Sequence, residues 1–224
     1  MRILVLDSSL SRCTAALVVD GTVAALGTDD RERGHEAVLP GLVRDVMPPA
    51  DASGSTRLDL IAVTVGPGSF TGIRAGLALA HGIGLALAVP VTGVTVGEAI
   101  ADAFPHLGDR ELWTVTPSRR GHVFLERGGE AVSLAEDSLP MPVGKVAIAG
   151  AAALPVAARL AALGANVMLT DARYPLPRHI AQVAARRLAG LVPPRAAQPL
   201  YVDPPEARLP AGGLRPPPET SGTP

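Results

Sequence analysis

The sequence predicts an α/β fold of two lobes, and three observations support it. In the first hundred residues, short apolar runs typical of strands alternate with segments of helical periodicity. The second half also opens with three strand-like runs, which hints at an old duplication without a sequence repeat. Finally, 224 residues of which 47% are hydrophobic can bury a sizeable core. Because only 3% are aromatic, Ala, Val and Leu must fill it.

The first lobe is predicted to have the order β-β-β-α-β-α-β-α. Asp20-Gly21 between two apolar runs is a strong hairpin signal, because both turn residues must accept positive φ. Pro40 favours a helix start near 37, since proline is tolerated in the first helical turn. The expected elements are strands at 3–6, 14–19 and 22–26, a helix within 35–47, a strand at 58–65, a helix at about 70–88, a strand at 91–94 and a helix at 96–104.

The second half is predicted to contain five strands and two helices. The strands are expected at 112–116, 122–126, 131–134, 145–149 and 166–169, and the helices at 151–163 and 177–191. From residue 193 onward ten of 32 residues are proline, so this tail cannot build a core. We therefore expect an N-terminal lobe over 1–105, a smaller C-terminal lobe over 106–192 and a largely disordered tail over 193–224.

Charge and cysteine content exclude several classes of protein. The formal net charge is −1, without the clustered positive charge that usually grips nucleic acid. Cys13 is the single cysteine, so there is neither an intrachain disulfide nor a cysteine-based zinc site. The most apolar stretch, 75–89, is shorter than the roughly 20 residues of a bilayer span. We expect a cytoplasmic protein.

The turn Gly66-Pro-Gly-Ser-Phe-Thr-Gly-Ile-Arg74 stands where a strand gives way to a helix, and Ser69 is placed to cap that helix. Free amides at a helix N-terminus attract anions. The spacing nevertheless fits neither a P-loop, which ends in Gly-Lys-Ser/Thr, nor a dinucleotide fingerprint. A tight structural turn and an anion site both remain possible readings.

Small residues recur at every fourth position of the helix that follows. A helix that is apolar nearly all round must be buried, and a single sheet covers only one side of it. The stripe therefore predicts close packing, either under the second lobe or against another chain. Its members are Gly72, Gly76, Ala80, Gly84 and Ala88.

Four segments in order resemble the TsaB (YeaZ) family. They are Ile3-Leu-Val-Leu-Asp-Ser-Ser9, His35-Glu-Ala-Val-Leu-Pro40, Asp59 to Ala78, and Val89-Pro-Val-Thr-Gly-Val94. The segment 199–205 also resembles the family's usual ending. The resemblance implies two ribonuclease-H-like lobes of the actin, sugar-kinase and Hsp70 (ASKHA) type, and a non-catalytic partner of the paralogue TsaD. With the ATPase TsaE, that pair transfers threonylcarbamoyl to the adenosine next to the tRNA anticodon.

The resemblance also implies a pairing surface on the helices near 36–47 and 70–88, used by a heterodimer or, without TsaD, by a homodimer. The residues expected there are His35, Leu39, Leu42, Val43, Val46, Ser69, Phe70, Thr71, Gly72, Ile73, Arg74, Gly76, Leu77, Ala80, His81 and Gly84. A vestigial nucleotide site is expected at Asp7, Ser8, Ser9, Gly66 and Gly68.

Catalytic ligands are missing from the sequence. TsaD-type proteins hold a metal through His-x-x-x-His, but Leu39 stands four residues after His35 and no other histidines are so spaced. A kinase or ATPase of this fold needs carboxylates at the start of both lobes. Asp7 occupies the first of these positions, where it is also a candidate to cap the turn after its strand. At the start of the second lobe, this chain has Thr116-Pro-Ser-Arg119 where the family commonly has Asp-Ala-Arg. We expect no metal and no cofactor in the chain alone, with ATP or ADP entering only in a complex.

Three functional hypotheses follow: a scaffold subunit for TsaD, a nucleotide hydrolase or metallopeptidase of the same fold, and a self-associating homodimer of other role. The basic pairs Arg119-Arg120 and Arg186-Arg187 are candidates for tRNA contact, but no aromatic residues interleave with them, so a solvated face is the simpler reading.

Overall fold

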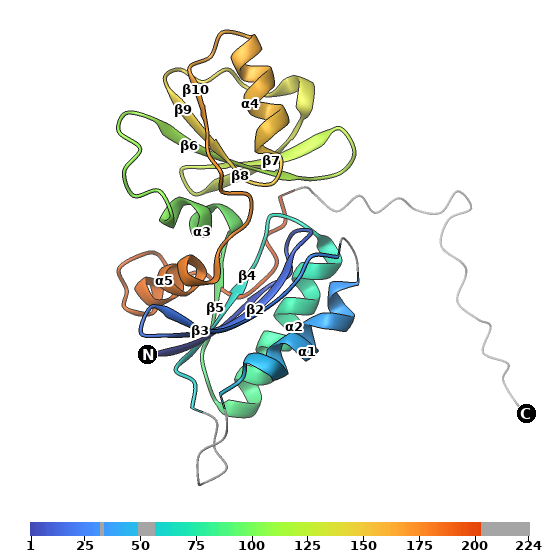
Figure 1. Ribbon diagram of the computed structural model, residues 1–224, viewed down its shortest axis with the longest axis vertical. Coiled ribbons are helices and arrows are strands. Elements are labelled where there is room, and N and C mark those ends of the chain that lie inside the picture. Colours follow the sequence, from blue (N-terminus) through green and yellow to red (C-terminus); the bar gives the residue numbers. More distant parts are fainter. Residues whose placement is uncertain (32–33, 49–56, 203–224) are drawn as a thin grey trace, which may run out of the picture.

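The computed structural model describes residues 1–31, 34–48 and 57–202, which form two lobes, each on a five-stranded mixed sheet (Figure 1). The first sheet has the order β3-β2-β1-β4-β5, in which β1 runs antiparallel to β2 and parallel to β4. Its strands are β1 (Arg2–Asp7), β2 (Cys13–Val19), β3 (Thr22–Asp29), β4 (Leu60–Thr64) and β5 (Val91–Val94). The predicted element order of the first lobe is confirmed.

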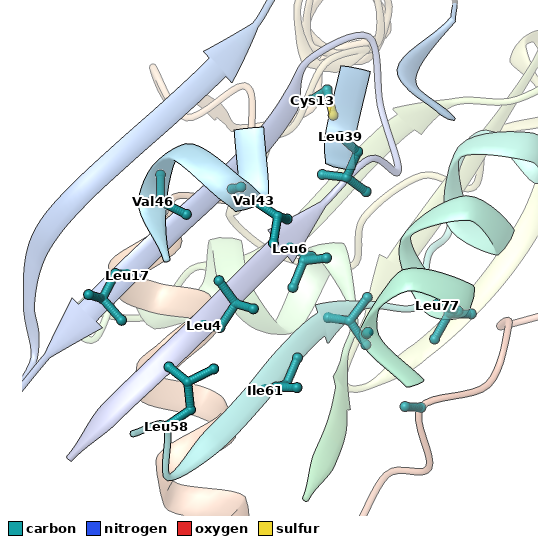
Figure 2. Close-up of a cluster of buried hydrophobic side chains, with 14 of the residues drawn as sticks. Leu4, Leu6, Cys13, Leu17, Leu39, Val43, Val46, Leu58, Ile61 and Leu77 are labelled. Carbon is teal, nitrogen blue, oxygen red and sulfur yellow. The ribbon is translucent and has the colours of Figure 1, made fainter. Parts of the chain in front are cut away.

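Helices cover both faces of this sheet, so its central strands are apolar on both sides. Helices α1 (His35–Val46) and α2 (Phe70–Leu87) pack on one face, where Leu4 and Leu6 of β1 meet Leu39 of α1 (Figure 2). On the other face, the alternate residues Ile3 and Val5 belong to a second core. The period of two along a strand thus divides β1 between two layers of helices.

The second sheet, β10-β9-β6-β7-β8, repeats the order of the first when read from β8 to β10. Its strands are β6 (Glu111–Pro117), β7 (His122–Arg127), β8 (Glu130–Ala135), β9 (Val146–Ala149) and β10 (Val167–Leu169). Helix α4 (Ala153–Ala162) covers one face, over a core that contains Trp113 and Leu160. Only a 3₁₀ turn, Glu136–Ser138, replaces the equivalent of α1. The duplicated element order is therefore real.

The last helix, α5 (Pro177–Leu188), belongs to the first lobe, so the predicted boundary of 106–192 for the second lobe is wrong at its end. Ile180, Val183 and Ala184 of α5 pack in one core with residues of β1, β2, β4 and β5. Helix α3 (Val96–Asp102) packs against both α5 and β6. Figure 1 shows α3 and α5 between the two sheets. An amphipathic pattern identifies a helix but does not say which sheet its apolar face covers.

Two smaller expectations also change. Helix α1 begins at His35 with Pro40 inside it, because burial of Leu39, Val43 and Val46 holds the helix on the sheet. The start of the tail is ordered against the first lobe, where the Leu200 amide donates to the Val65 carbonyl at 2.8 Å. The remainder of the tail, 203–224, lies outside the described residues.

Candidate functional site

The glycine-rich turn lies against the loop that follows β1. The Ser69 amide donates to the Ser9 carbonyl at 2.7 Å, and a Cβ at Gly68 would lie 2.0 Å from that same carbonyl oxygen. Ser69 caps α2, as predicted, by accepting a hydrogen bond from the Gly72 amide at 3.2 Å. The backbone amides of Ser69 and Gly72, at the start of this helix, thus already donate hydrogen bonds within the chain. The glycines serve close backbone packing, which favours the structural reading of the motif.

Asp7 is the last residue of β1, and its buried carboxylate points into the protein. Its Oδ1 accepts hydrogen bonds from the Ser9 amide at 3.0 Å, the Ser9 hydroxyl at 2.6 Å and the Thr64 hydroxyl at 2.6 Å. Burial raises the pKa of Asp7, although these hydrogen bonds oppose the rise. The expectation that Asp7 caps the turn is confirmed. Ser8 likewise faces inward, and its hydroxyl donates to the Gly72 carbonyl at 2.8 Å.

A cleft of about 380 Å³ separates this loop from the second lobe. Its lining includes Ser9, Ser69 and Phe70 from the first lobe, and Ser118, Arg119 and Phe124 from the second, but no carboxylate. Among the described residues, no group of three or more His, Cys, Asp or Glu side chains is placed to hold a metal. The lining therefore does not fit a magnesium nucleotide, which needs carboxylate ligands.

The small-residue stripe of α2 faces the chain's own first sheet, which corrects its assignment to a partner surface. A Cβ at Gly72 would lie 2.0 Å from the Ser8 carbonyl oxygen, and one at Gly84 would lie 2.5 Å from Val91 Cγ2. A Cβ at Gly76 would lie 2.8 Å from Ser8 Oγ, and Ala80 is fully buried. Gly76→Arg or Ala80→Arg would therefore disrupt the first lobe itself.

Burial also removes other members of the expected pairing surface from direct contact with a partner. His35 is buried, and its Nε2 lies 2.6 Å from the Arg31 carbonyl oxygen. The members that the first lobe buries are His35, Leu39, Val43, Val46, Gly72, Ile73, Gly76, Leu77, Ala80 and Gly84. Those that remain exposed or partly exposed are Leu42, Ser69, Phe70, Thr71, Arg74 and His81.

The outward face of α2 combines exposed apolar and basic side chains, and the sequence pattern did not separate this face from the buried stripe. Phe70 and Leu85 are 64% and 88% exposed and lie on the same side of the helix as Arg74, Ala78 and His81. Among the described residues, α2 is also the one helix long and apolar enough by composition to cross a bilayer. In this structure its other side, with Ile73 and Leu77, packs into the core of the first lobe.

The C-terminal segment contributes residues that sequence reasoning missed. Arg74 places its guanidinium 3.2 Å from the centre of the Phe70 ring and donates to the Tyr201 hydroxyl at 2.9 Å. His81 Nε2 lies 2.7 Å from the Ala197 carbonyl oxygen. The family-like ending at 199–205 was the available signal, because its apolar Leu200 and Tyr201 stand out in a proline-rich tail.

The basic pairs differ from one another in the structure. Arg187 is buried and donates to the Gly93 and Pro193 carbonyls and to Glu98, so it is a structural residue and not part of a solvated face. Arg186 pairs with Asp102. Arg119 lines the cleft, and its Nη2 lies 3.3 Å from His122 Nε2.

Comparison with known proteins connects this architecture to a family. The family model described as TsaD, tRNA N6-adenosine threonylcarbamoyltransferase, matches residues 29–190. The TsaB proteins ("tRNA threonylcarbamoyladenosine biosynthesis protein TsaB") of Escherichia coli K12 and Bacillus subtilis 168 are 33% and 30% identical over 125 and 124 residues. These matches cover 55% of this chain, but they span only about half of each relative, 53% in both cases.

Two further relatives extend the match. An uncharacterized protein of Mycobacterium tuberculosis H37Rv is 35% identical over 160 residues, covering 66% of this chain and 72% of that protein. The solved structure of YeaZ from Pseudomonas aeruginosa superimposes with a TM-score of 0.68 at 22% identity, over 89% of this chain and 99% of that one, and so shares the two-lobe fold. The chain therefore belongs to the family of the TsaD model and, within it, to the TsaB (YeaZ) branch.

Proposed function

We propose that this chain is a non-catalytic subunit in the biosynthesis of threonylcarbamoyladenosine in tRNA, and that it pairs with a TsaD-type catalytic subunit. The TsaB names of two relatives support the pathway, and the match to the TsaD model supports a pair of paralogous chains. In this proposal the complex transfers threonylcarbamoyl to the adenosine next to the anticodon and works with a TsaE-type ATPase. Such a reaction on tRNA belongs in the cytoplasm.

The observation that carries the non-catalytic role is the interlobe cleft without a carboxylate. Phosphoryl transfer in this cleft would need ligands for magnesium, and hydrolysis would need a base for water. Asp7 ends the strand before the cleft loop, and its Oδ1 accepts three hydrogen bonds from groups of the same chain. We accordingly propose that ATP or ADP enters this cleft only at the level of the complex. The purified chain is expected not to hydrolyse ATP or peptides.

The outward face of α2 supports the pairing. Phe70 and Leu85 are large apolar side chains exposed on one side of α2, with Arg74 and His81 between them, and exposed apolar side chains gathered on one face mark an interaction site in many proteins. This face lies on the side of the first sheet that carries α1 and α2 (Figure 1), away from α3 and α5. We propose that the same face forms a homodimer when TsaD is absent.

Reconstitution tests the proposal. Purified TsaD, TsaE and the adenylate-forming enzyme are assayed for threonylcarbamoyladenosine in tRNA with and without this chain. We expect modification only when the chain is present. Equal modification without it would overturn the proposal.

A matched pair of variants tests the surface. Leu85→Arg is expected to weaken binding to TsaD at least about tenfold, because it puts a charge into the proposed apolar contact. Leu188→Arg, on the exposed side of α5, is the control, since Leu188 is 52% exposed on the opposite side of the sheet. Pull-down or calorimetry with both variants at wild-type affinity would exclude this face.

A further inference from the structure

A second cavity, of about 510 Å³, lies beside α3 and the segment 171–179, on the side of the first sheet opposite α1 and α2. Its size is within the range of about 300–1,000 Å³ typical of small-molecule sites. Three arginines, two aromatic rings and one carboxylate contribute to its lining: Arg12, Arg173, Arg178, Phe104, Tyr174 and Asp171. Neither the cleft nor the outward face of α2 uses any of them.

Two of the arginines leave positive charge unneutralised at this cavity. Arg173 Nη1 donates to the Thr170 carbonyl at 2.7 Å, which fixes its position, and the described residues provide no carboxylate partner for it. Arg178 Nε donates to His179 Nε2 at 2.9 Å. Because a guanidinium only donates, that imidazole nitrogen must accept, and the proton sits on Nδ1, which faces Asp102 at 2.7 Å.

The Asp102–His179 pair thus holds Arg178 in place, and these hydrogen bonds bring no carboxylate into contact with the Arg178 guanidinium. Arg12 differs, because its Nε pairs with Asp30 at 2.6 Å. Its guanidinium also stacks 4.6 Å from the centre of the Tyr174 ring, whose hydroxyl lies 3.1 Å from Ser11 Oγ. The ring of Tyr174 is therefore fixed beside the two unneutralised guanidinium groups.

Fixed guanidinium groups bind phosphate oxygens, and fixed aromatic rings pack against planar bases. We propose that this cavity is a nucleotide site, with the phosphate at Arg173 and Arg178 and the base beside Phe104 and Tyr174. Asp171 contributes the single carboxylate of the lining, so the net charge of the lining side chains remains positive. The bound unit comes either from a free nucleotide or from an RNA strand. The site does not depend on pairing with TsaD.

Calorimetry on the full chain with AMP, adenosine, inorganic phosphate and an unphosphorylated single-stranded RNA tests the proposal. We expect saturable AMP binding, with adenosine and phosphate each at least about tenfold weaker, because the site uses both parts of the ligand. If the RNA binds and AMP displaces it while AMP itself binds weakly, the result would support the site and identify RNA as the source of the bound nucleotide. Absence of saturable binding of both AMP and RNA up to about 10 mM nucleotide would overturn it.

Variants locate the site. Arg178→Ala is expected to weaken AMP about tenfold, and Tyr174→Leu is expected to weaken AMP but not phosphate. Arg159→Ala on α4 is the matched control, because this exposed arginine lies outside the lining of the cavity and donates to the Asp137 carbonyl. Photolabelling of the wild-type chain with azido-AMP, read by mass spectrometry, gives a measurement independent of variant folding. Labelling at 104 or 171–179 supports the site, whereas labelling confined elsewhere, or unchanged AMP affinity in both variants, contradicts it.

Discussion

Gly72 and Gly82 share helix α2, yet their surroundings predict opposite effects of the same substitution. A Cβ at 72 would lie 2.0 Å from the Ser8 carbonyl oxygen, whereas nothing lies within 4 Å of one at 82. Gly72→Ala is expected to lower the free energy of unfolding by about 2 kcal/mol, because the backbone of the Ser8 loop must move. Gly82→Ala is expected to raise it by about 0.5–1 kcal/mol, since alanine favours a helix. Urea denaturation of both variants checks the contrast, and equal losses would contradict it.

Asp7 gives a second test at the residue scale. Asp7→Ala removes the acceptor of three hydrogen bonds and is expected to cost about 2–3 kcal/mol of unfolding free energy. Asp7→Asn keeps an acceptor oxygen and removes a carboxylate whose pKa is raised by burial. The loss of unfolding free energy in this variant is therefore expected to be less than half of the loss in Asp7→Ala. Asp45→Ala, at an exposed ion pair of α1, is the control with little effect. A costly Asn variant would show that the negative charge itself is needed.

At the scale of elements, the sequence predicted every strand and long helix in order, because each carries its own periodicity or turn signal. It could not assign α5 to a lobe, since Ile180 and Val183 define an apolar face but not the sheet beneath it. For the same reason, the small-residue stripe of α2 indicated close packing but did not identify the element against which it packs. Burial against β1, β4 and β5 is a property of the assembled lobe, and it removes the small-residue side of α2 from the expected pairing surface while leaving the other side exposed.

The placement of α5 is testable by one deletion of side-chain volume. Ile180 is fully buried between α5 and the first sheet, so Ile180→Ala is expected to cost about 2–5 kcal/mol. Hydrogen exchange should accelerate in β1 and β5, while β6 and β9 keep their protection. Leu188→Ala, at an exposed position of the same helix, is the control. Faster exchange in the second sheet alone would place α5 with the other lobe.

At the scale of the whole molecule, Glu126 of β7 joins the lobes. It is buried, its Oε2 accepts a hydrogen bond from the Gly97 amide at 2.8 Å, and its Oε1 accepts one from the Thr95 hydroxyl. Both partners lie at the start of α3, which links the two sheets. Burial raises the pKa of Glu126 to about 7, against 4.5 for the free side chain.

This raised pKa makes the junction depend on pH. The folded state holds the Glu126 proton at pH values where the unfolded state has lost it, so the contribution of this group is full below about pH 4.5 and is lost as the pH rises through about 7. The loss is on the order of 3 kcal/mol. Glu126→Gln keeps the size and an acceptor but cannot ionise. The difference in unfolding free energy between Glu126→Gln and wild type should therefore grow in favour of the variant from pH 4.5 to 8, as measured by urea denaturation. Because the comparison is between two proteins that share every other titrating group, including Asp7, a constant difference over that range would mean that Glu126 stays ionised in the folded junction.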